Sequence, residues 1–431
     1  MQRTNFCVLF ARVERVIRRP SIDRKLSLTV AQSVTDTGGN MRTSAVLIFL
    51  LAVLTVIAGL HYYLWLRLIR DPHWPAPWPS LATTVLILAA LSIPATLLLL
   101  RVSPYVVRLM AWPAFVWIGL MFLGVVVLGG ADVLRLAISL GRRAMTSSPI
   151  DAERRLFFAR CLAGGALVTA GGLGIAGMRS ALSEVKVHRI EIPLRRLTAR
   201  HDGITLVQLT DLHIGPTIRK RDLAAIVHHT NSLLPDLVAI TGDLVDGTVY
   251  QLRDAVSPLA ELRAKHGVFF VTGNHEYFSG AASWVEEISR LGIRVLRNER
   301  VVIGGAEAGF DLAGVDDRSA ARSSEEGHGE NLEKALGGRD PNRAVILLAH
   351  QPRTVLDAAK FGVDLQLSGH THGGQIWPFG ALVRLQQRFL AGLGQYGDTT
   401  IYVSRGTGYW GPPMRLFAPA EITQIVLRSL A

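Results

Sequence analysis

The chain has 431 residues, a formal net charge of +12 and an apolar fraction of 49%. This length allows two or three domains, and the apolar fraction together with a mean hydropathy of +0.30 exceeds what a purely soluble enzyme needs. The basic excess gathers in the N-terminal tail and in loops beside apolar segments, so it does not predict nucleic-acid binding, and the two cysteines, Cys7 and Cys161, leave residues 183–431 without a disulfide or a thiolate site.

Residues 1–40 form a basic segment ahead of the first apolar run. Seven Arg or Lys residues lie between positions 3 and 25, with little apolar sequence to bury, which predicts a disordered tail. The sequence Met41-Arg42-Thr43 directly precedes the apolar run and resembles an initiation site. We therefore expect translation to begin at Met41, and a translated, disordered tail is the alternative.

Residues 41–182 are expected to cross the membrane three or four times. Three segments of about 20 residues lack Asp, Glu, Lys and Arg and are long enough to cross a bilayer: 44–66, 81–100 and 109–131. Tyr and Trp residues stand at their ends, as in the aromatic belts of membrane proteins. A buried core helix would explain one such segment but not three in succession. Residues 161–178 form a shorter, Gly-rich segment that we expect to be a fourth span.

The pair Arg154-Arg155, followed by Leu156-Phe157-Phe158, precedes this fourth segment. It resembles a twin-arginine export signal, and the alternative is two arginines that hold a cytoplasmic loop. Both interpretations place the start of the segment in the cytoplasm. The loops then hold seven arginines inside and three outside, which obeys the positive-inside rule, although a translated tail would favour the opposite orientation. We predict a multi-pass protein of the cell membrane whose C-terminal domain is extracytoplasmic.

Residues 183–431 alternate apolar runs with polar motifs. Five runs predict buried strands, at residues 204–209, 237–240, 268–271, 345–348 and 365–367. The motifs that follow them are Asp211-Leu212-His213, Gly242-Asp243-Leu244-Val245-Asp246, Gly273-Asn274-His275-Glu276, His350 and Gly369-His370-Thr371-His372. Helix-like segments at 223–234 and 252–264 separate the first three motifs, as in successive βαβ units. The pattern predicts a largely parallel sheet with the motifs beyond the carboxyl ends of its strands.

These motifs, together with the segments 369–375, 402–406 and 419–422, resemble those of the calcineurin-like metallophosphoesterases, in particular a membrane-associated branch. The resemblance runs from about His188 to the C-terminus. It implies an α/β domain of two mixed β-sheets packed face to face and flanked by helices, here preceded by an all-α transmembrane region. It also implies seven metal ligands: Asp211, His213 and His372 for one cation, Asn274, His350 and His370 for the other, and Asp243 as the bridge.

The chemistry of these side chains agrees with this assignment of ligands to two cations that share Asp243. A carboxylate between two cations about 3.5–4 Å apart holds them close, while the neutral Asn274 preserves Lewis acidity at the second cation. A water or hydroxide that bridges the metals then serves as the nucleophile, so no side-chain nucleophile is needed. By resemblance, His275 is the catalytic histidine that stabilises the phosphoryl group or protonates the leaving oxygen. Asp246 is expected to act behind the ligands rather than as one of them.

Differences from related classes of phosphatase narrow the choice of substrate and of metal ion. Asp246 is followed by Gly247-Thr248, where protein Ser/Thr phosphatases of this superfamily have Arg-Gly, which disfavours a phosphoprotein substrate. Purple acid phosphatases have a tyrosine at the position of Asp246, so a mixed-valence iron site is disfavoured as well. We expect two divalent cations, Mn²⁺ foremost, with Fe or Zn as alternatives for this N/O ligand set.

The function expected from the sequence is metal-dependent hydrolysis of a phosphoester or pyrophosphate, in a lipid or small molecule, at the outer membrane face. One alternative is a membrane signalling or binding module with an idle phosphoesterase domain, and another is a cytoplasm-facing nucleotide phosphodiesterase. Two aromatic and Pro-rich stretches, at residues 377–379 and 409–414, are expected to form an apolar lip near the metals or simply to close the core. No nucleic-acid partner is expected, and the oligomeric state is left open.

Overall fold

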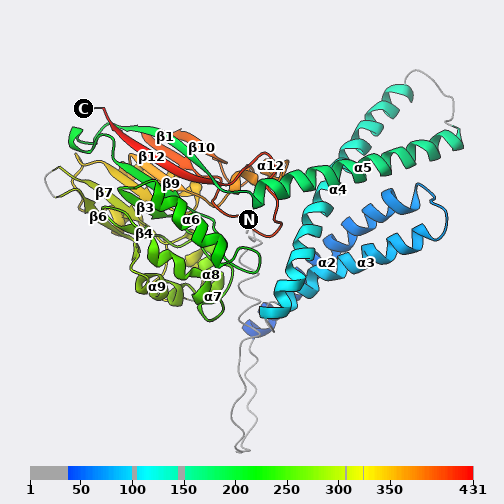
Figure 1. Ribbon diagram of the computed structural model, residues 1–431, viewed down its shortest axis with the longest axis horizontal. Coiled ribbons are helices and arrows are strands. Elements are labelled where there is room, and N and C mark those ends of the chain that lie inside the picture. The colour runs from blue at the N-terminus through cyan, green and yellow to red at the C-terminus, as the bar shows by residue number, and fades with distance from the viewer. Residues whose placement is uncertain (1–36, 100–103, 144–150, 306–307, 324, 431) are drawn as a thin grey trace, which may run out of the picture.

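The computed structural model describes residues 37–99, 104–143, 151–305, 308–323 and 325–430. The predicted basic tail lies outside the described residues up to position 36. Figure 1 shows an arm of long helices beside an α/β domain, and one of these helices, α5, runs from the arm to the domain.

Four described helices are long and apolar enough to cross a membrane, and they contain the three segments predicted as spans and the fourth, Gly-rich one. The helices are α2 (Thr37–Trp65), which continues as a π-helical turn η1 (Leu66–Arg70), α3 (Trp78–Leu99), α4 (Pro104–Arg143) and α5 (Ala152–Leu182). Helix α4 runs past residue 131, the end predicted from the absence of charge. Its Asp132 accepts hydrogen bonds from Tyr63 (2.8 Å) and Arg67 (3.0 Å), so the carboxylate is paired within the helical region.

The α/β domain contains two six-stranded mixed sheets. The first has the order β1 (Lys186–Leu194), β12 (Glu421–Ser429), β2 (Thr205–Leu209), β3 (Leu237–Ile240), β4 (Val268–Phe270) and β5 (Arg294–Val295). The second has the order β10 (Gly392–Tyr396), β11 (Thr399–Val403), β9 (Leu365–Ser368), β8 (Val345–Leu348), β7 (Phe310–Gly314) and β6 (Glu299–Ile303). Neighbouring strands are parallel except in the pairs β12–β2, β6–β7 and β10–β11.

The predicted strands are therefore present, but they are divided between two sheets instead of lying in one. β2, β3 and β4 belong to the first sheet, and β8 and β9 belong to the second. β3, β4 and β8 are wholly apolar because both faces of each sheet are covered, whereas β2 and β9 each include one buried glutamine, Gln208 and Gln366. Leu206 of β2 lies in the core between the sheets, whereas its neighbour Val207 packs against the outer helices.

Helices cover the outer faces of both sheets and complete four layers. The helices of the first sheet are α6 (Lys220–Ser232), α7 (Val249–Val256) with the 3-10 turn η3 (Ser257–Glu261) and α9 (Ala281–Arg290), while α8 (Asn274–Ser279) follows β4 and packs against the start of α9. Short helices α10 (Leu332–Leu336) and α11 (Val355–Ala358) lie against the second sheet. The predicted helical segment 252–264 is two pieces, because Pro258 stands in the first turn of η3. This architecture confirms the fold class implied by the resemblance.

Candidate metal centre

The polar motifs follow the carboxyl ends of strands from both sheets. Asp211 and His213 come after β2, Asp243 after β3 and Asn274 after β4. The second sheet contributes His350 after β8, and His370 and His372 after β9. Because the two sheets face each other, these loops converge from opposite sides. The structure brings all seven predicted ligands to one end of the domain.

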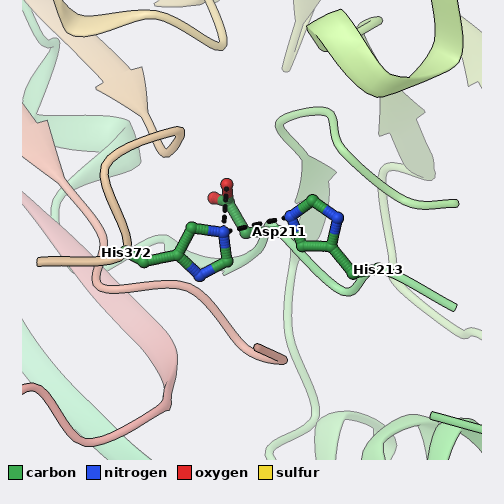
Figure 2. A group of neighbouring side chains, drawn as sticks. All are labelled: Asp211, His213 and His372. Carbon is green, nitrogen blue, oxygen red and sulfur yellow. Dashed lines mark hydrogen bonds and ion pairs between the residues drawn. The ribbon is translucent and has the colours of Figure 1, made fainter. Parts of the chain in front are cut away.

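One group of three side chains matches the first predicted cation site. The ligand atoms of Asp211, His213 and His372 lie within 4.8 Å of one another (Figure 2). The Nε2 atoms of His213 and His372 are 3.0 Å apart, and Nε2 of His372 is 3.4 Å from Oδ1 of Asp211. Two imidazole nitrogens and a carboxylate oxygen that point at one small space suit a divalent transition-metal ion.

A second group contains Asp243, His350 and His370. Nε2 of His350 lies 3.1 Å from Oδ2 of Asp243 and 3.3 Å from Nδ1 of His370. Oδ1 of Asn274 is buried and has no hydrogen-bond partner among the described residues. A buried oxygen without a partner is costly in a folded protein, and a cation would satisfy it. The donor set therefore fits a metal ion at this second position.

Asp243 stands between the two groups. Its Oδ2 is 3.1 Å from Nε2 of His350, 3.8 Å from Nε2 of His213 and 3.9 Å from Nε2 of His275. Its Oδ1 accepts a hydrogen bond from the backbone N–H of His275 at 2.9 Å. The carboxylate thus faces imidazoles of both groups, as a bridging ligand must.

The backbone of the centre is strained in a way that sequence patterns do not reveal. Five of the seven predicted ligands have positive φ although none is glycine: Asp211 (53°), His213 (48°), Asp243 (51°), His370 (72°) and His372 (51°). Only a few per cent of non-glycine residues adopt this left-handed conformation, and it persists where the surroundings hold it in place. Positive φ at so many neighbouring non-glycine residues is typical of a functional site.

Glu276 holds two of the ligand loops together. Its buried carboxylate accepts hydrogen bonds from the backbone N–H groups of Asp243 (3.0 Å), Leu244 (2.8 Å) and Gly273 (2.6 Å). Gly273 must be glycine, because a Cβ there would lie 2.2 Å from Oδ1 of Asp243. The sequence showed Glu276 as part of a motif, but its role in aligning the loops of Asp243 and Asn274 was not predicted.

Asp246 lies behind two histidines of the centre. Its Oδ1 is 2.9 Å from Nδ1 of His213 and 2.6 Å from Nδ1 of His275. Burial disfavours the charged carboxylate, but the two imidazoles more than offset this and lower the pKa of Asp246. Contact with Nδ1 leaves the Nε2 atom of each ring to face the centre.

The electrostatic environment divides the histidines into two kinds. Burial disfavours the charged form of His275, but Asp243 and Asp246 more than offset this and raise the pKa of its imidazole to about 9. Burial and the neighbouring His350 lower the pKa of His370 to about 3. Burial and the Arg415 guanidinium likewise lower the pKa of His372. His370 and His372 are therefore neutral, which is the form in which imidazole binds a metal.

Two facing mixed sheets with this donor set beyond their strand ends define a metal-dependent phosphoesterase, which is a hydrolase. The family model described as calcineurin-like phosphoesterase matches residues 204–374. A Bos taurus protein named transmembrane protein with metallophosphoesterase domain is 38% identical over 386 residues, which cover 85% of this chain and 86% of that protein. The chain therefore belongs to the calcineurin-like phosphoesterase family.

Two further relatives show how far the similarity extends. A Danio rerio protein of the same name is 40% identical over 61% of this chain and 62% of its own length. A Bacillus subtilis protein described as an uncharacterized metallophosphoesterase is 34% identical over 62% of this chain and 94% of its own length. Together with the four apolar helices, the transmembrane-named relatives indicate a membrane protein.

Proposed function

We propose that this chain is a membrane-anchored phosphoesterase that binds two divalent cations. Asp211, His213 and His372 would hold one cation, Asn274, His350 and His370 would hold the other, and Asp243 would be the ligand shared by both. The observation that carries the proposal is the position of Asp243, whose Oδ2 lies 3.8 Å from Nε2 of His213 in the first group and 3.1 Å from Nε2 of His350 in the second. When bound, the two cations would supply Lewis acidity and activate a shared water as the nucleophile. The N/O donor set favours Mn²⁺, with Fe or Zn as alternatives.

The side chain of His275 supplies acid catalysis in this proposal. The neighbouring carboxylates of Asp243 and Asp246 raise the pKa of its imidazole, and in this proposal the ring is protonated, with Nδ1 donating a hydrogen bond to Asp246 at 2.6 Å. The Nε2–H group then points toward the centre, where it can hydrogen-bond a phosphoryl oxygen or protonate the leaving oxygen. Asp246 keeps the ring in this orientation. No serine or cysteine nucleophile is required.

We place the catalytic domain on the extracytoplasmic side of the cell membrane. Arg154 and Arg155 lie exposed in the first turns of α5, and α5 leads to β1 with no further helix between them. Arginines at this end favour the cytoplasm, so the other end of a spanning α5 carries the domain outside. The twin-arginine interpretation, in which the folded domain is exported, gives the same orientation.

One experiment tests catalysis and orientation together. Right-side-out membrane vesicles that contain the full chain are stripped with a chelator and supplied with an activated phosphodiester that does not cross the membrane. We expect no hydrolysis until Mn²⁺ is added to the outside, because the bridged pair of cations activates the water. Inside-out vesicles should remain inactive until they are opened with detergent.

The alternatives predict different outcomes in the same vesicles. Activity only in inside-out vesicles would place the domain in the cytoplasm and favour a nucleotide phosphodiesterase. A metal-replete protein that is inactive on a broad phosphoester panel in either orientation would favour the signalling or binding module.

The double substitution of Arg154 and Arg155 by lysine should remove outside activity if the pair is an export signal, and should change nothing if it only anchors the loop.

We further propose that the substrate is lipid-linked. Exposed aromatic side chains lie between the helical arm and the centre: Trp377 (58% exposed), Phe379 (44%), Trp410 (53%) and Phe417 (77%). The ring of Phe379 meets Phe122 of α4 at 6.1 Å, and the ring of Trp410 lies 5.6 Å from that of His275. Exposed aromatic side chains that contact a membrane helix at one point and the catalytic histidine at another support access from the bilayer, where tethering raises the effective concentration of a lipid.

The substitution Trp410→Ala should reduce hydrolysis of a lipid pyrophosphate in vesicles while sparing a soluble phosphodiester. We expect a loss of about tenfold, since removing one aromatic contact of about 1.4 kcal/mol has that effect. The measurement compares kcat/KM of the full chain on both substrates. The matched control is Tyr250→Ala, which removes an aromatic side chain that is 96% exposed on α7. An equal loss on both substrates would assign Trp410 to packing, and a preference for soluble nucleotides would contradict the lipid proposal.

A further inference from the structure

The segment around Met414 connects the membrane helices to the metal centre. Met414 is fully buried and packs with Leu123 of α4, Ala170 of α5, Ile376 and Leu416. The backbone N–H of the next residue, Arg415, donates a hydrogen bond to the carbonyl of Gly177 in α5 at 2.9 Å. The catalytic domain therefore touches α4 and α5 through a specific contact besides the chain connection at the end of α5.

Glycines in the two helices make room for Met414. A Cβ at Gly119 of α4 would lie 2.5 Å from Sδ of Met414, and a Cβ at Gly177 of α5 would lie 3.3 Å from its Cβ. Other glycines of α5, such as Gly171 and Gly172, have no neighbouring atom within 4 Å of an added Cβ. The Gly-rich character of α5 thus has a local steric reason at Gly177 that it does not have at Gly172.

Arg415 extends this contact into the first ligand group. Its side chain is 1% exposed, and its guanidinium donates to the backbone carbonyls of His372 (3.0 Å), Arg405 (2.6 Å), Gly408 (3.1 Å) and Ala418 (3.2 Å). A second guanidinium nitrogen lies 3.1 Å from Nδ1 of His372.

The loop that Arg415 holds also supports Asp211. The backbone N–H of Gly408 donates to the carbonyl of Asp211 at 3.0 Å. Arg415 thus fixes His372 directly and Asp211 through the loop, so two of the three side chains in the first group depend on it. The planar guanidinium suits this task because its five donors are held in one rigid fork.

We propose that α4 and α5 hold the Asp211, His213 and His372 group in its binding geometry through Met414 and Arg415, so that the membrane helices set the affinity of one of the two cation sites. Arg415 is a positioning residue here, and it contacts neither the substrate nor the reacting atoms. The inference rests on the proposed function, since it assigns one cation to this group. It does not depend on the identity of the substrate.

The test is the substitution Gly177→Leu in the full chain, purified in detergent. The added side chain meets Met414 and the backbone of Arg415. We expect Mn²⁺ affinity at one site to fall about 10–100-fold, the usual effect of disturbing residues behind metal ligands, while the other site is unchanged. A titration followed by Mn²⁺ electron paramagnetic resonance distinguishes the spin-coupled pair from a single bound ion. The variant should show single ions at metal concentrations that give pairs in the wild type.

The matched control is Gly172→Leu, which adds the same side chain to the same helix where no atom lies within 4 Å. It should bind pairs as the wild type does. Arg415→Ala should reproduce the Gly177→Leu result, and Met414→Leu, which keeps an apolar side chain of similar size, should retain the pair. These variants separate the proposed coupling from a general effect of altering α5.

Three outcomes would contradict the inference. Wild-type affinity at both sites in Gly177→Leu and Arg415→Ala would show that the helices do not act on the centre. An equal loss at both sites, together with loss of cooperative unfolding, would show a general packing role. Wild-type protein that binds no pair at all would contradict the proposed function itself, which is a different result from a wild-type pair that persists in the variants.

Discussion

Replacing Asp243 with asparagine should abolish hydrolysis, with a fall in kcat of about 10³-fold or more on an activated phosphodiester. Asparagine keeps the shape of the side chain but removes the negative charge that faces imidazoles of both groups. Without that charge the repulsion between two cations is no longer offset, and the pair should disperse. Steady-state kinetics and the metal content per chain measure the two parts of this expectation.

A suitable control is Asp254→Asn on α7, where the carboxylate is 87% exposed and pairs with Lys220. It should leave both kinetics and metal content unchanged, because an exposed ion pair contributes little. Full turnover by Asp243→Asn with two ions still bound would contradict the bridging role. It would also remove the observation on which the proposed function depends.

The second large effect is expected at His275. His275→Ala should lower kcat by about 10²–10⁴-fold, the range for loss of a general acid, while both metal ions remain bound. The reason is that its Nε2–H group would act on the phosphoryl or leaving oxygen, and the ligands of both groups are left in place. The measurement is kcat at saturating Mn²⁺ beside the metal content of the same sample.

The control for this variant is His228→Ala, a histidine exposed on α6 that should not affect turnover. A parallel loss of metal and activity in His275→Ala would instead make His275 a ligand. That outcome has a structural basis, because His213, Asp243 and His275 form a third group with ligand atoms within 4.8 Å. Unchanged turnover would exclude both roles.

Much of the fold could be predicted because its strands are buried on both faces. Residues 237–240 and 345–348 were predicted as strands and match β3 and β8, since each is a short apolar run. The division into two sheets could not be predicted from such runs, because the sequence of a buried strand does not specify which other strand it pairs with. The resemblance to a known family supplied that part of the prediction.

Local sequence also failed to predict where the final strand lies. β12 is parallel to β1, with Lys186 opposite Glu421, and antiparallel to β2, with Thr423 opposite Gln208. This strand joins segments that are distant in the sequence, and no turn or loop length specifies the pairing. A sequence pattern that repeats every few residues holds no information on such a contact.

In the candidate centre, the proposed ligands could be predicted from the sequence, but the residues that support them could not. The motifs, through their resemblance to a known family, pointed to Asp211, His350 and the other proposed ligands, and the structure places them together. Glu276 and Arg415 were not predicted to support them because each acts through backbone N–H or carbonyl groups, which every residue possesses. The signal that could have found them is a charged residue in a segment otherwise buried, since such a charge needs several hydrogen bonds. Arg415 between Met414 and Leu416 fits that description.

The position of β12 has a consequence for how the protein is made. As the chain leaves the ribosome, β1 follows α5 directly, yet the strand it pairs with, β12, is the last of the described strands to be synthesised. Until β12 arrives, β1 and β2 each present an unpaired edge, and such edges invite wrong pairing. Completion of the first sheet therefore requires β12, so a chain cut before Glu421 would keep α2 to α5 but lose the strand that joins β1 to β2.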